Sequence, residues 1–290
     1  MQAFDYVAPS SVQEAVAVLA KHGAAARVLA GGTDLIIQAR EGRRDVAVMV
    51  DVKGIAEATQ LSLAGDGSLR IGAATSCSAI YHNKDVAKAF PALIDSASLI
   101  GSVQIQSRAS IGGNLCNSGP AGDSIPTLIA LGATCHIAGP AGERTVPVEE
   151  FCTGPSRNVV QNGEMLVSIS FPAPAANSGA AFERFIPRNE MDIAVANACS
   201  NVTLSADGQT FTAARIAIGA VAPTPLYVPA AGAALVGQPV SDATIAKACE
   251  AAQAAATPIT DMRGSVEQRN HLVGVLVRRT INKAVKRARG

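Results

Sequence analysis

Aromatic residues and net charge are both scarce in this sequence of 290 residues. Aromatics make up 3% of the chain and Trp is absent, which disfavours base-stacking surfaces and sugar-binding platforms. The formal net charge is +1, which argues against a protein that binds nucleic acid or acidic surfaces in general. No stretch reaches the roughly 18 uninterrupted apolar residues of a membrane span, so we expect no such span.

Cysteine pairs of the metal-binding type are also missing. None of the six cysteines lies in a C-x-x-C pair, and their spacings are wide, so a zinc or iron–sulfur site within this chain is disfavoured and we expect no metal ligand. Cysteines scattered over apolar positions indicate buried thiols in a reducing compartment. The chain lacks an opening basic segment followed by an apolar run, and we therefore expect a cytoplasmic protein.

The common catalytic and nucleotide-binding motifs are absent as well. There is no G-x-G-x-x-G run of the Rossmann type, no P-loop and no G-x-S-x-G elbow. The four histidines show no H-E-x-x-H spacing, so each is interpreted as a lone surface or capping residue. No residue is assigned as a catalytic acid, base or nucleophile.

The residues that are present can build a large core. Hydrophobic residues make up 48% of the sequence, which suits one large or two medium domains. Ser11 and Glu14 form a capping-box pattern before a helix that ends near Gly23. The other elements expected in this half are strands at 27–30, 46–52, 133–138 and 165–171, a hairpin at 60–73, and helices at 35–40, 78–90, 92–100 and 125–131, the last capped by Asp123 or Ser124.

The second half begins after a segment rich in Pro, Ala, Ser and Gly at 172–179, which is the best candidate for a domain boundary. Apolar runs at 180–186, 193–204 and 213–221 predict an antiparallel sheet, and helices at 242–256 and 266–287 close the chain. The last helix has basic residues and no acid after Glu267. It could bind a membrane surface or an acidic partner. We favour the interpretation that its charges complement the helix dipole and lie in solvent.

Two Gly-Gly loops stand out. Ala30-Gly31-Gly32-Thr33-Asp34 lies between a predicted strand and a predicted helix, and Ser110-Ile111-Gly112-Gly113-Asn114 lies in a stretch at 107–123 that is dense in Gly, Ser and Asn. Paired glycines let backbone N–H groups approach an anion closely, which would suit a diphosphate held without Lys or Arg. The alternative interpretation is that both loops are plain tight turns.

The paired loops, with Ser118-Gly119-Pro120-Ala121-Gly122-Asp123 behind the second, resemble the FAD-binding medium subunit of the molybdenum hydroxylases. That family includes xanthine dehydrogenase, carbon monoxide dehydrogenase and nicotinate dehydrogenase. The resemblance covers nearly the whole chain. It extends to Phe4-Asp5-Tyr6-x-x-Pro9 near the start and to Asp261-Met262-Arg263-Gly264-Ser265 before the last helix.

The resemblance implies an α+β fold. Its first part would be a two-subdomain FAD-binding domain of the vanillyl-alcohol-oxidase (PCMH) type at 1–175, with subdomains at about 1–57 and 58–175. A small α+β C-terminal domain of the molybdenum-hydroxylase flavoprotein type, with an antiparallel sheet and helices, would follow at 176–290.

The resemblance also implies the residues that contact FAD. The two glycine loops would hold the diphosphate, Asp123 would contact the ribityl or ribose hydroxyls, and Ile100 would lie near the flavin, while Leu166 and Arg184 would be further contacts. The full set implied is Leu29, Ala30, Gly31, Gly32, Thr33, Asp34, Leu35, Ile36, Ile100, Ser110, Ile111, Gly112, Gly113, Asn114, Asp123, Leu166 and Arg184. The stretch 188–192 aligns with a loop close to the isoalloxazine ring and is given no role.

By this resemblance the chain is an oxidoreductase subunit that transfers electrons through FAD. The flavin would accept electrons from two [2Fe-2S] clusters on a small subunit, while a large subunit with a molybdenum cofactor oxidises the substrate. The partners would form a heterotrimer or a dimer of heterotrimers. Non-covalent attachment is expected because no His or Cys lies in the first glycine loop. The alternative is a covalent bond to Cys116, which lies next to the second loop.

Departures from the family pattern narrow the choice of branch and substrate. The chain has no inserted cluster of cysteines, which disfavours the benzoyl-CoA-reducing branch. Thr33-Asp34 replaces the His/Gln-Ser of carbon monoxide dehydrogenases, which favours an N-heterocycle such as a purine or a nicotinate-like compound. The alternatives are a carbon monoxide dehydrogenase medium subunit, a non-redox module that binds a phosphate ligand, and a stand-alone flavin oxidase, which the absence of an acid/base pair disfavours.

Overall fold

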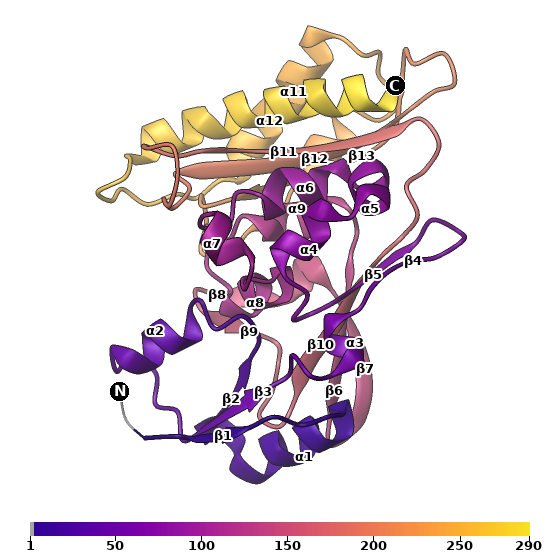
Figure 1. The fold of residues 1–290 in the computed structure, drawn as a ribbon. Coiled ribbons are helices and arrows are strands. Elements are labelled where there is room, and N and C mark those ends of the chain that lie inside the picture. Colours follow the sequence, from indigo (N-terminus) through magenta and orange to yellow (C-terminus); the bar gives the residue numbers. More distant parts are fainter. Residues whose placement is uncertain (1–2) are drawn as a thin grey trace.

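The N-terminal part of the chain forms a small parallel sheet. The computed structural model describes residues 3–290. The sheet has the strand order β1 (Asp5–Val7), β3 (Val48–Asp51), β2 (Ala26–Leu29). Helix α1 (Val12–His22) packs on it, and α2 (Leu35–Arg40) connects β2 to β3 (Figure 1). The strands expected at 27–30 and 46–52 and the helix expected at 35–40 are therefore confirmed, and they form a parallel β-α-β unit.

The first helix has the expected ends. The Ser11 side chain accepts the Glu14 N–H, and Gly23 caps the C-terminus with a φ of +52°. The reciprocal half of the capping box differs, because the Glu14 carboxylate accepts from the N–H and hydroxyl of Ser10 rather than from Ser11. Ser10 is thereby joined to the first turn of the helix.

A second sheet has the order β4-β5-β10-β6-β7. The predicted hairpin is present as two of these strands, and α3 precedes it. The bounds are α3 (Ala56–Thr59), β4 (Leu61–Leu63), β5 (Leu69–Gly72), β6 (Thr134–Gly139), β7 (Gly142–Pro147) and β10 (Met165–Phe171). The edge strand β7 and the small pair β8 (Cys152–Gly154) and β9 (Arg157–Asn158) were not expected, because an exposed edge needs no apolar alternation.

The helices between these strands differ from the expectation at three places. The helix expected at 78–90 is two helices, α4 (Cys77–His82) and α5 (Lys84–Ala89), because Asn83 ends one and caps the other by accepting the N–H groups of Asp85 and Val86. Helix α6 (Pro91–Ala97) is shorter than expected, and α7 (Val103–Gln106) follows it.

The glycine-rich stretch is also partly helical, which corrects the prediction of a loop. It contains α8 (Ile111–Asn117), capped by Ser110, so Gly112 and Gly113 lie in the first helical turn. Burial of Ile111 and Leu115 and the Ser110 cap offset the poor helix propensity of glycine. Helix α9 (Ser124–Ala130) begins where expected, but the Asp123 side chain makes no capping hydrogen bond.

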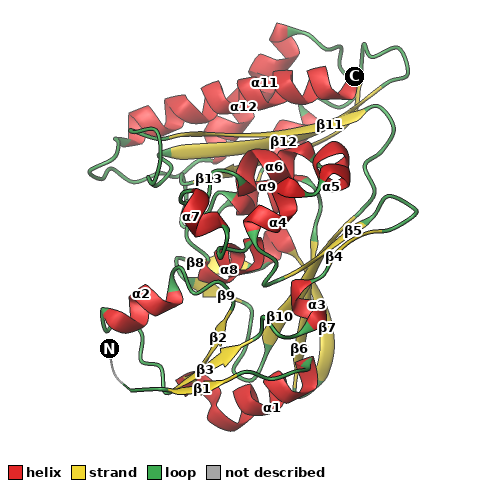
Figure 2. Cartoon of the chain, in the orientation of Figure 1, coloured by secondary structure: helices red, strands yellow, loops and turns green. Residues whose placement is uncertain are grey.

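The C-terminal part confirms the predicted antiparallel sheet. Its order is β11 (Ser178–Phe185), β12 (Ala196–Leu204), β13 (Phe211–Gly219), β14 (Leu226–Tyr227). Helices α10 (Pro229–Ala233), α11 (Asp242–Ala255) and α12 (Val266–Ala288) follow. One face of the sheet is covered by α12, with α11 against it, and α6 and α9 of the N-terminal part cover the other (Figures 1 and 2). The α+β architecture is therefore as expected.

The two parts of the chain share a hydrophobic core. Phe182, Cys199 and Ala217 of the C-terminal sheet belong to the same buried cluster as Phe90 and Leu93. The connection from β10 to β11 spans 172–177, but residues before and after it pack in the same cluster. The boundary at 175/176 and the division near 57 stay predictions.

Basic residues of the last helix take part in this contact. Lys283 and Arg287 both bind the Asp95 carboxylate on α6, at 3.1 Å and 2.6 Å. The interpretation that the basic residues of this helix simply lie in solvent is therefore wrong for these two. Over residues 3–290, no helix has both the length and the apolar character needed to cross a membrane. The same residues contain no group of three or more side chains arranged to hold a metal ion.

Candidate functional site

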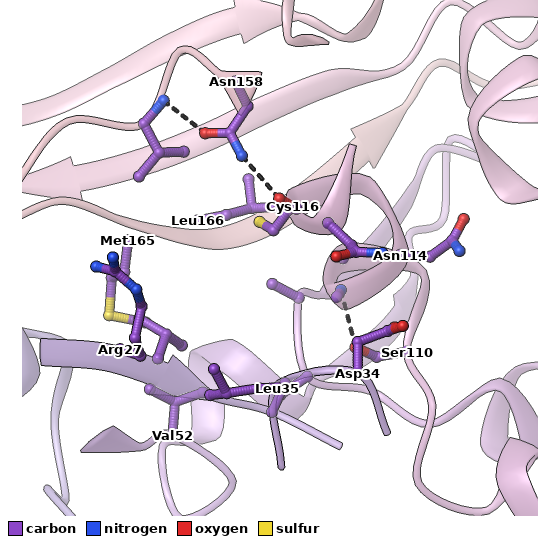
Figure 3. A pocket seen from close by; sticks show the side chains of 18 of the residues that line it. Arg27, Asp34, Leu35, Val52, Ser110, Asn114, Cys116, Asn158, Met165 and Leu166 are labelled. Atoms are coloured by element: carbon purple, nitrogen blue, oxygen red, sulfur yellow. Dashed lines mark hydrogen bonds between the residues drawn. The ribbon is translucent and has the colours of Figure 1, made fainter. Parts of the chain in front are cut away.

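A cavity of about 560 Å³ lies against the three-stranded sheet. Its walls come from β2 and the loop after it, from α8 and from the segment 153–166, as Figure 3 shows. This volume falls in the range of pockets that bury a small ligand or a cofactor. Both glycine loops reach this one cavity although they are far apart in the sequence.

The loops meet because two glycines allow close packing. A Cβ on Gly31 would lie 1.9 Å from the carbonyl oxygen of Arg108, just before the second loop. A Cβ on Gly112 would lie 2.4 Å from the carbonyl oxygen of Ala73. These two glycines are therefore required by the fold itself.

The other two glycines have different constraints. Gly32 has a φ of +74°, a conformation that side chains rarely adopt. Gly113 has ordinary helical geometry, and its missing Cβ would contact only the Ser110 hydroxyl, at 3.0 Å. Packing therefore gives the weakest reason for a glycine at position 113, and Gly113 lines the cavity. A bare backbone at this wall fits a cofactor that approaches the chain closely.

Polar groups beside Gly113 are held in place. The Ser110 hydroxyl accepts the Gly113 N–H at 3.0 Å, and the Asn114 Oδ1 accepts the hydroxyl of Ser124 at 2.7 Å. The first helical turn leaves the N–H groups of Ile111 and Gly112 without intrahelical acceptors. Diphosphate oxygens are acceptors of the kind such donors need.

The structure brings most of the sequence-predicted site residues to this cavity. The members that line it are Ala30, Gly31, Gly32, Thr33, Asp34, Leu35, Ile100, Ser110, Gly112, Gly113, Asn114 and Leu166. Leu29 and Ile111 are instead buried in hydrophobic clusters, and Ile36 is exposed on α2. Their contact with a cofactor stays a prediction.

Asp123 and Arg184 lie outside the cavity lining and bind each other. Arg184 donates to the Asp123 carboxylate, and Asn197 lies 3.5 Å from its other oxygen. Burial raises the pKa of Asp123 to about 6, although Arg184 and Asn197 act in the opposite direction. The contacts of Asp123 with Arg184 and Asn197 join the start of α9 to the C-terminal sheet. The roles of both residues toward a cofactor stay predictions.

Three arginines that the sequence patterns did not single out also line the cavity. They are Arg27, Arg44 and Arg157, and none forms an ion pair with a carboxylate within residues 3–290. They lie outside both loops, so the cavity has positive charge that the loops lack. No pattern in the sequence marked these arginines as site residues, because each reaches the cavity through the tertiary fold.

Cys116 lines the cavity near the second loop. Burial, with a smaller contribution from Cys152, raises the pKa of Cys116 to about 12. The thiol is therefore protonated at neutral pH and is a poor nucleophile. This chemistry suits a site that holds its ligand without a covalent bond.

Two family models together match almost the whole chain. A model described as "FAD binding domain in molybdopterin dehydrogenase" matches residues 2–174, and one described as "CO dehydrogenase flavoprotein C-terminal domain" matches residues 181–284. The chain belongs to the FAD-binding family of the molybdopterin dehydrogenases. The cavity and both glycine loops lie within the residues that the first model matches.

Relatives of this flavoprotein span its full length. It is 32% identical to the xanthine dehydrogenase FAD-binding subunit of Escherichia coli O157:H7, over 98% of this chain and 97% of the relative. It is 34% identical to the carbon monoxide dehydrogenase medium chain of Afipia carboxidovorans, over 99% and 98%. The solved carbon monoxide dehydrogenase of Hydrogenophaga pseudoflava matches with a TM-score of 0.94 and 34% identity, over 99% of this chain and 98% of that one. The chain is therefore a flavoprotein of the molybdenum hydroxylases.

Proposed function

We propose that this chain binds FAD non-covalently in the cavity and serves as the electron-transfer subunit of a molybdenum-containing hydroxylase. The observation that carries the proposal is that both glycine loops line one cavity, one wall of which is the bare backbone at Gly113. When bound, FAD supplies chemistry that collects electrons and passes them on in pairs. The chain itself binds and orients the cofactor.

The proposed cofactor contacts remain those implied by the family resemblance. Gly113, Ser110 and Asn114 would bind the diphosphate from one side and Gly31 to Asp34 from the other. Ile100 and Leu166 would supply apolar contact, since both line the cavity. Asp123, at the border of the C-terminal sheet, would contact the ribityl or ribose hydroxyls, and Arg184 would be a further contact. We likewise propose residues 1–175 as the FAD-binding domain and 176–290 as the C-terminal domain.

We propose a small iron–sulfur subunit and a large molybdenum subunit as partners. Support comes from the relatives, which bear names such as "medium chain" and "FAD-binding subunit". The final electron acceptor would be NAD+, a quinone, oxygen or another acceptor outside this chain.

An N-heterocycle is the proposed substrate of the whole enzyme. Relatives named for xanthine, caffeine and nicotinate support this reading. A carbon monoxide dehydrogenase is the second candidate, favoured by the TM-score of 0.94 with such an enzyme. Anaerobic addition of xanthine, nicotinate or carbon monoxide to the native complex, read as bleaching of the flavin, separates the two.

Gly113→Ala tests the cofactor site. The change adds a methyl group at the cavity wall, 3.0 Å from the Ser110 hydroxyl. Alanine favours a helix over glycine by about 1 kcal/mol, which offsets this tight contact, so the fold should hold. We expect FAD affinity to fall at least about tenfold, measured by fluorescence titration of the apoprotein. Acid precipitation of the wild-type protein should leave the flavin in the supernatant.

Gly119→Ala is the matched control, since a Cβ there meets nothing within 4 Å and Gly119 does not line the cavity. It should bind FAD as the wild-type protein does. A wild-type chain that binds no flavin would contradict the proposal. So would a Gly113→Ala variant that keeps stoichiometric FAD with unchanged affinity.

A further inference from the structure

Three side chains behind the first glycine loop form a hydrogen-bonded network. Tyr6 on β1 donates its hydroxyl to the Asp51 carboxylate at 2.5 Å, and the Lys53 Nζ donates to the same carboxylate at 2.6 Å. The Lys53 Nζ also donates to the backbone carbonyl of Ala30 at 2.9 Å. The network therefore links β1 and the end of β3 to the residue with which the first glycine loop begins.

The network is charged and largely shielded from solvent. The side chains of Lys53 and Asp51 are 32% and 12% exposed. Burial raises the pKa of Asp51, but the hydrogen bonds from Lys53 and Tyr6 outweigh burial, and the net pKa is lowered. The hydrogen bond to Asp51 raises the pKa of Tyr6, so the hydroxyl stays protonated and remains a donor. An ionised Asp51 thus holds the Lys53 ammonium beside the Ala30 carbonyl.

The contact with Ala30 sets the orientation of a peptide group in the cavity wall. The peptide bond between Ala30 and Gly31 is trans, and the C=O and N–H of a trans peptide point in opposite directions. The Ala30 carbonyl faces Lys53, so the Gly31 N–H is directed away from Lys53. Ala30 and Gly31 line the cavity, whereas Lys53 does not.

The Gly31 N–H is one of four successive donors in this loop. No backbone carbonyl within residues 3–290 accepts the N–H of Gly31, Gly32, Thr33 or Asp34. Successive N–H groups of this kind form a concavity that suits an anion. The oxygens of a diphosphate would supply the acceptors that the loop lacks.

We propose that Lys53, held by Asp51 and Tyr6, is a positioning residue that orients the Gly31 N–H toward the cofactor diphosphate. The inference rests on the proposed function, because it takes the cavity as the FAD site. Lys53 acts through the Ala30 carbonyl and does not touch the ligand. The first glycine loop has no Lys or Arg of its own, and in this way it depends on a cation behind it.

Lys53→Met tests the positioning with the full chain freed of flavin, because methionine keeps an apolar stem but donates no hydrogen bond. We expect FAD affinity to fall about tenfold, the loss typical of one hydrogen bond from a charged donor, measured by calorimetry. Asp51→Asn combined with Lys53→Met removes both charges and should lose nearly as much. Wild-type affinity in this double variant overturns the inference, because Lys53 would then act only by balancing the Asp51 charge.

The Gly31 amide gives a readout that needs no ligand. Selective isotope labelling of Ala–Gly peptide bonds resolves its NMR signal, which responds to the hydrogen bond on the preceding carbonyl. Lys53→Met should move this signal in the flavin-free chain, and FAD should move it more in the wild type than in the variant. An unmoved Gly31 signal in Lys53→Met overturns the inference. A wild-type chain that binds no FAD fails the proposed function instead.

Lys283→Met is the matched control. Lys283 also binds a carboxylate, that of Asp95, with side chains 38% and 15% exposed, and it lies outside the cavity lining. This variant should bind FAD as the wild-type protein does and leave the Gly31 signal in place, and both Met variants should melt cooperatively without flavin. An equal loss of FAD affinity in Lys283→Met also overturns the inference, because any broken ion pair would then loosen the site.

Discussion

At the scale of single residues, the four loop glycines have different reasons to be glycine. Gly31 and Gly112 are needed because backbone oxygens lie where a Cβ would be, and Gly32 because of its positive φ. Gly113 is the least constrained of the four, because a Cβ there would meet only the Ser110 hydroxyl, at 3.0 Å. A sequence shows four equivalent glycines, so only the packing separates the three that the fold requires from the one that it constrains least.

Gly31→Ala should therefore damage the fold rather than the cofactor site alone. A Cβ placed 1.9 Å from the Arg108 oxygen forces the two loops apart. We expect the free energy of unfolding to fall by at least about 3 kcal/mol, measured by urea denaturation without flavin. Gly119→Ala, at an open position, should change it by less than about 1 kcal/mol. A Gly31→Ala variant as stable as the Gly119→Ala variant would refute this view of the contact.

At the scale of elements, α6 is tied to the C-terminal sheet by one carboxylate. Asp95 binds Lys283 and Arg287 of α12, and one of its oxygens accepts the N–H of Phe182 on β11 at 3.2 Å. Burial raises the pKa of Asp95, but the hydrogen bonds and charge of Arg287 outweigh burial, and the net pKa is lowered. The contact thus stabilises the folded chain while Asp95 is ionised.

Asp95→Asn should lower the free energy of unfolding by about 2 kcal/mol or more near neutral pH, because two cations lose their partner. For a carboxyl with a lowered folded pKa, the stabilisation is present above the unfolded value of about 3.9 and is lost as the pH falls through the folded pKa. The wild type and the variant should therefore converge in stability below about pH 4. Urea denaturation between pH 3 and pH 7 measures this.

Asp242→Asn provides the comparison, since that side chain is 94% exposed and lies 3.9 Å from Arg278. An exposed pair of this kind contributes little, so the substitution should be nearly neutral. A gap between the wild type and Asp95→Asn that stays constant down to pH 3 would contradict the ion-pair account.

At the scale of the whole molecule, the C-terminal sheet is a wall of the N-terminal core. Every residue of α9 from Ser124 to Ala130 is buried, and this helix packs on β12 and β13. Phe182, Cys199 and Ala217 complete the cluster around Phe90. The segment 172–177 separates the parts along the chain but not in space.

A fragment of residues 1–175 should therefore lack a native core. We expect it to melt without a cooperative transition and to bind a hydrophobic dye, because α6 and α9 lose their cover. Calorimetry and dye fluorescence measure both effects. The matched control is a full chain cleaved once within 172–177, which keeps all packing and should melt cooperatively. A fragment that melts as sharply as the cleaved full chain would disprove the shared core.

The sequence by itself determined the elements whose signals lie within a few neighbouring residues. Ser11 and Gly23 mark the two ends of α1. The alternating apolar residues from Leu61 to Ile71 predicted the hairpin, and the glycine pairs indicated an anion site. Family membership followed from the two loops together with the flanking motifs. These features are local in the chain, so their physical causes can be read from it.

Only the tertiary structure decided the features that depend on distant contacts. Helix α8 forms through glycine residues because Ile111 and Leu115 are buried. Arg27 and Arg44 reach the cavity from outside the loops, and Asp95 meets Arg287 across 192 residues. Burial and charge pairing between remote segments set these outcomes, and no window of the sequence contains both partners.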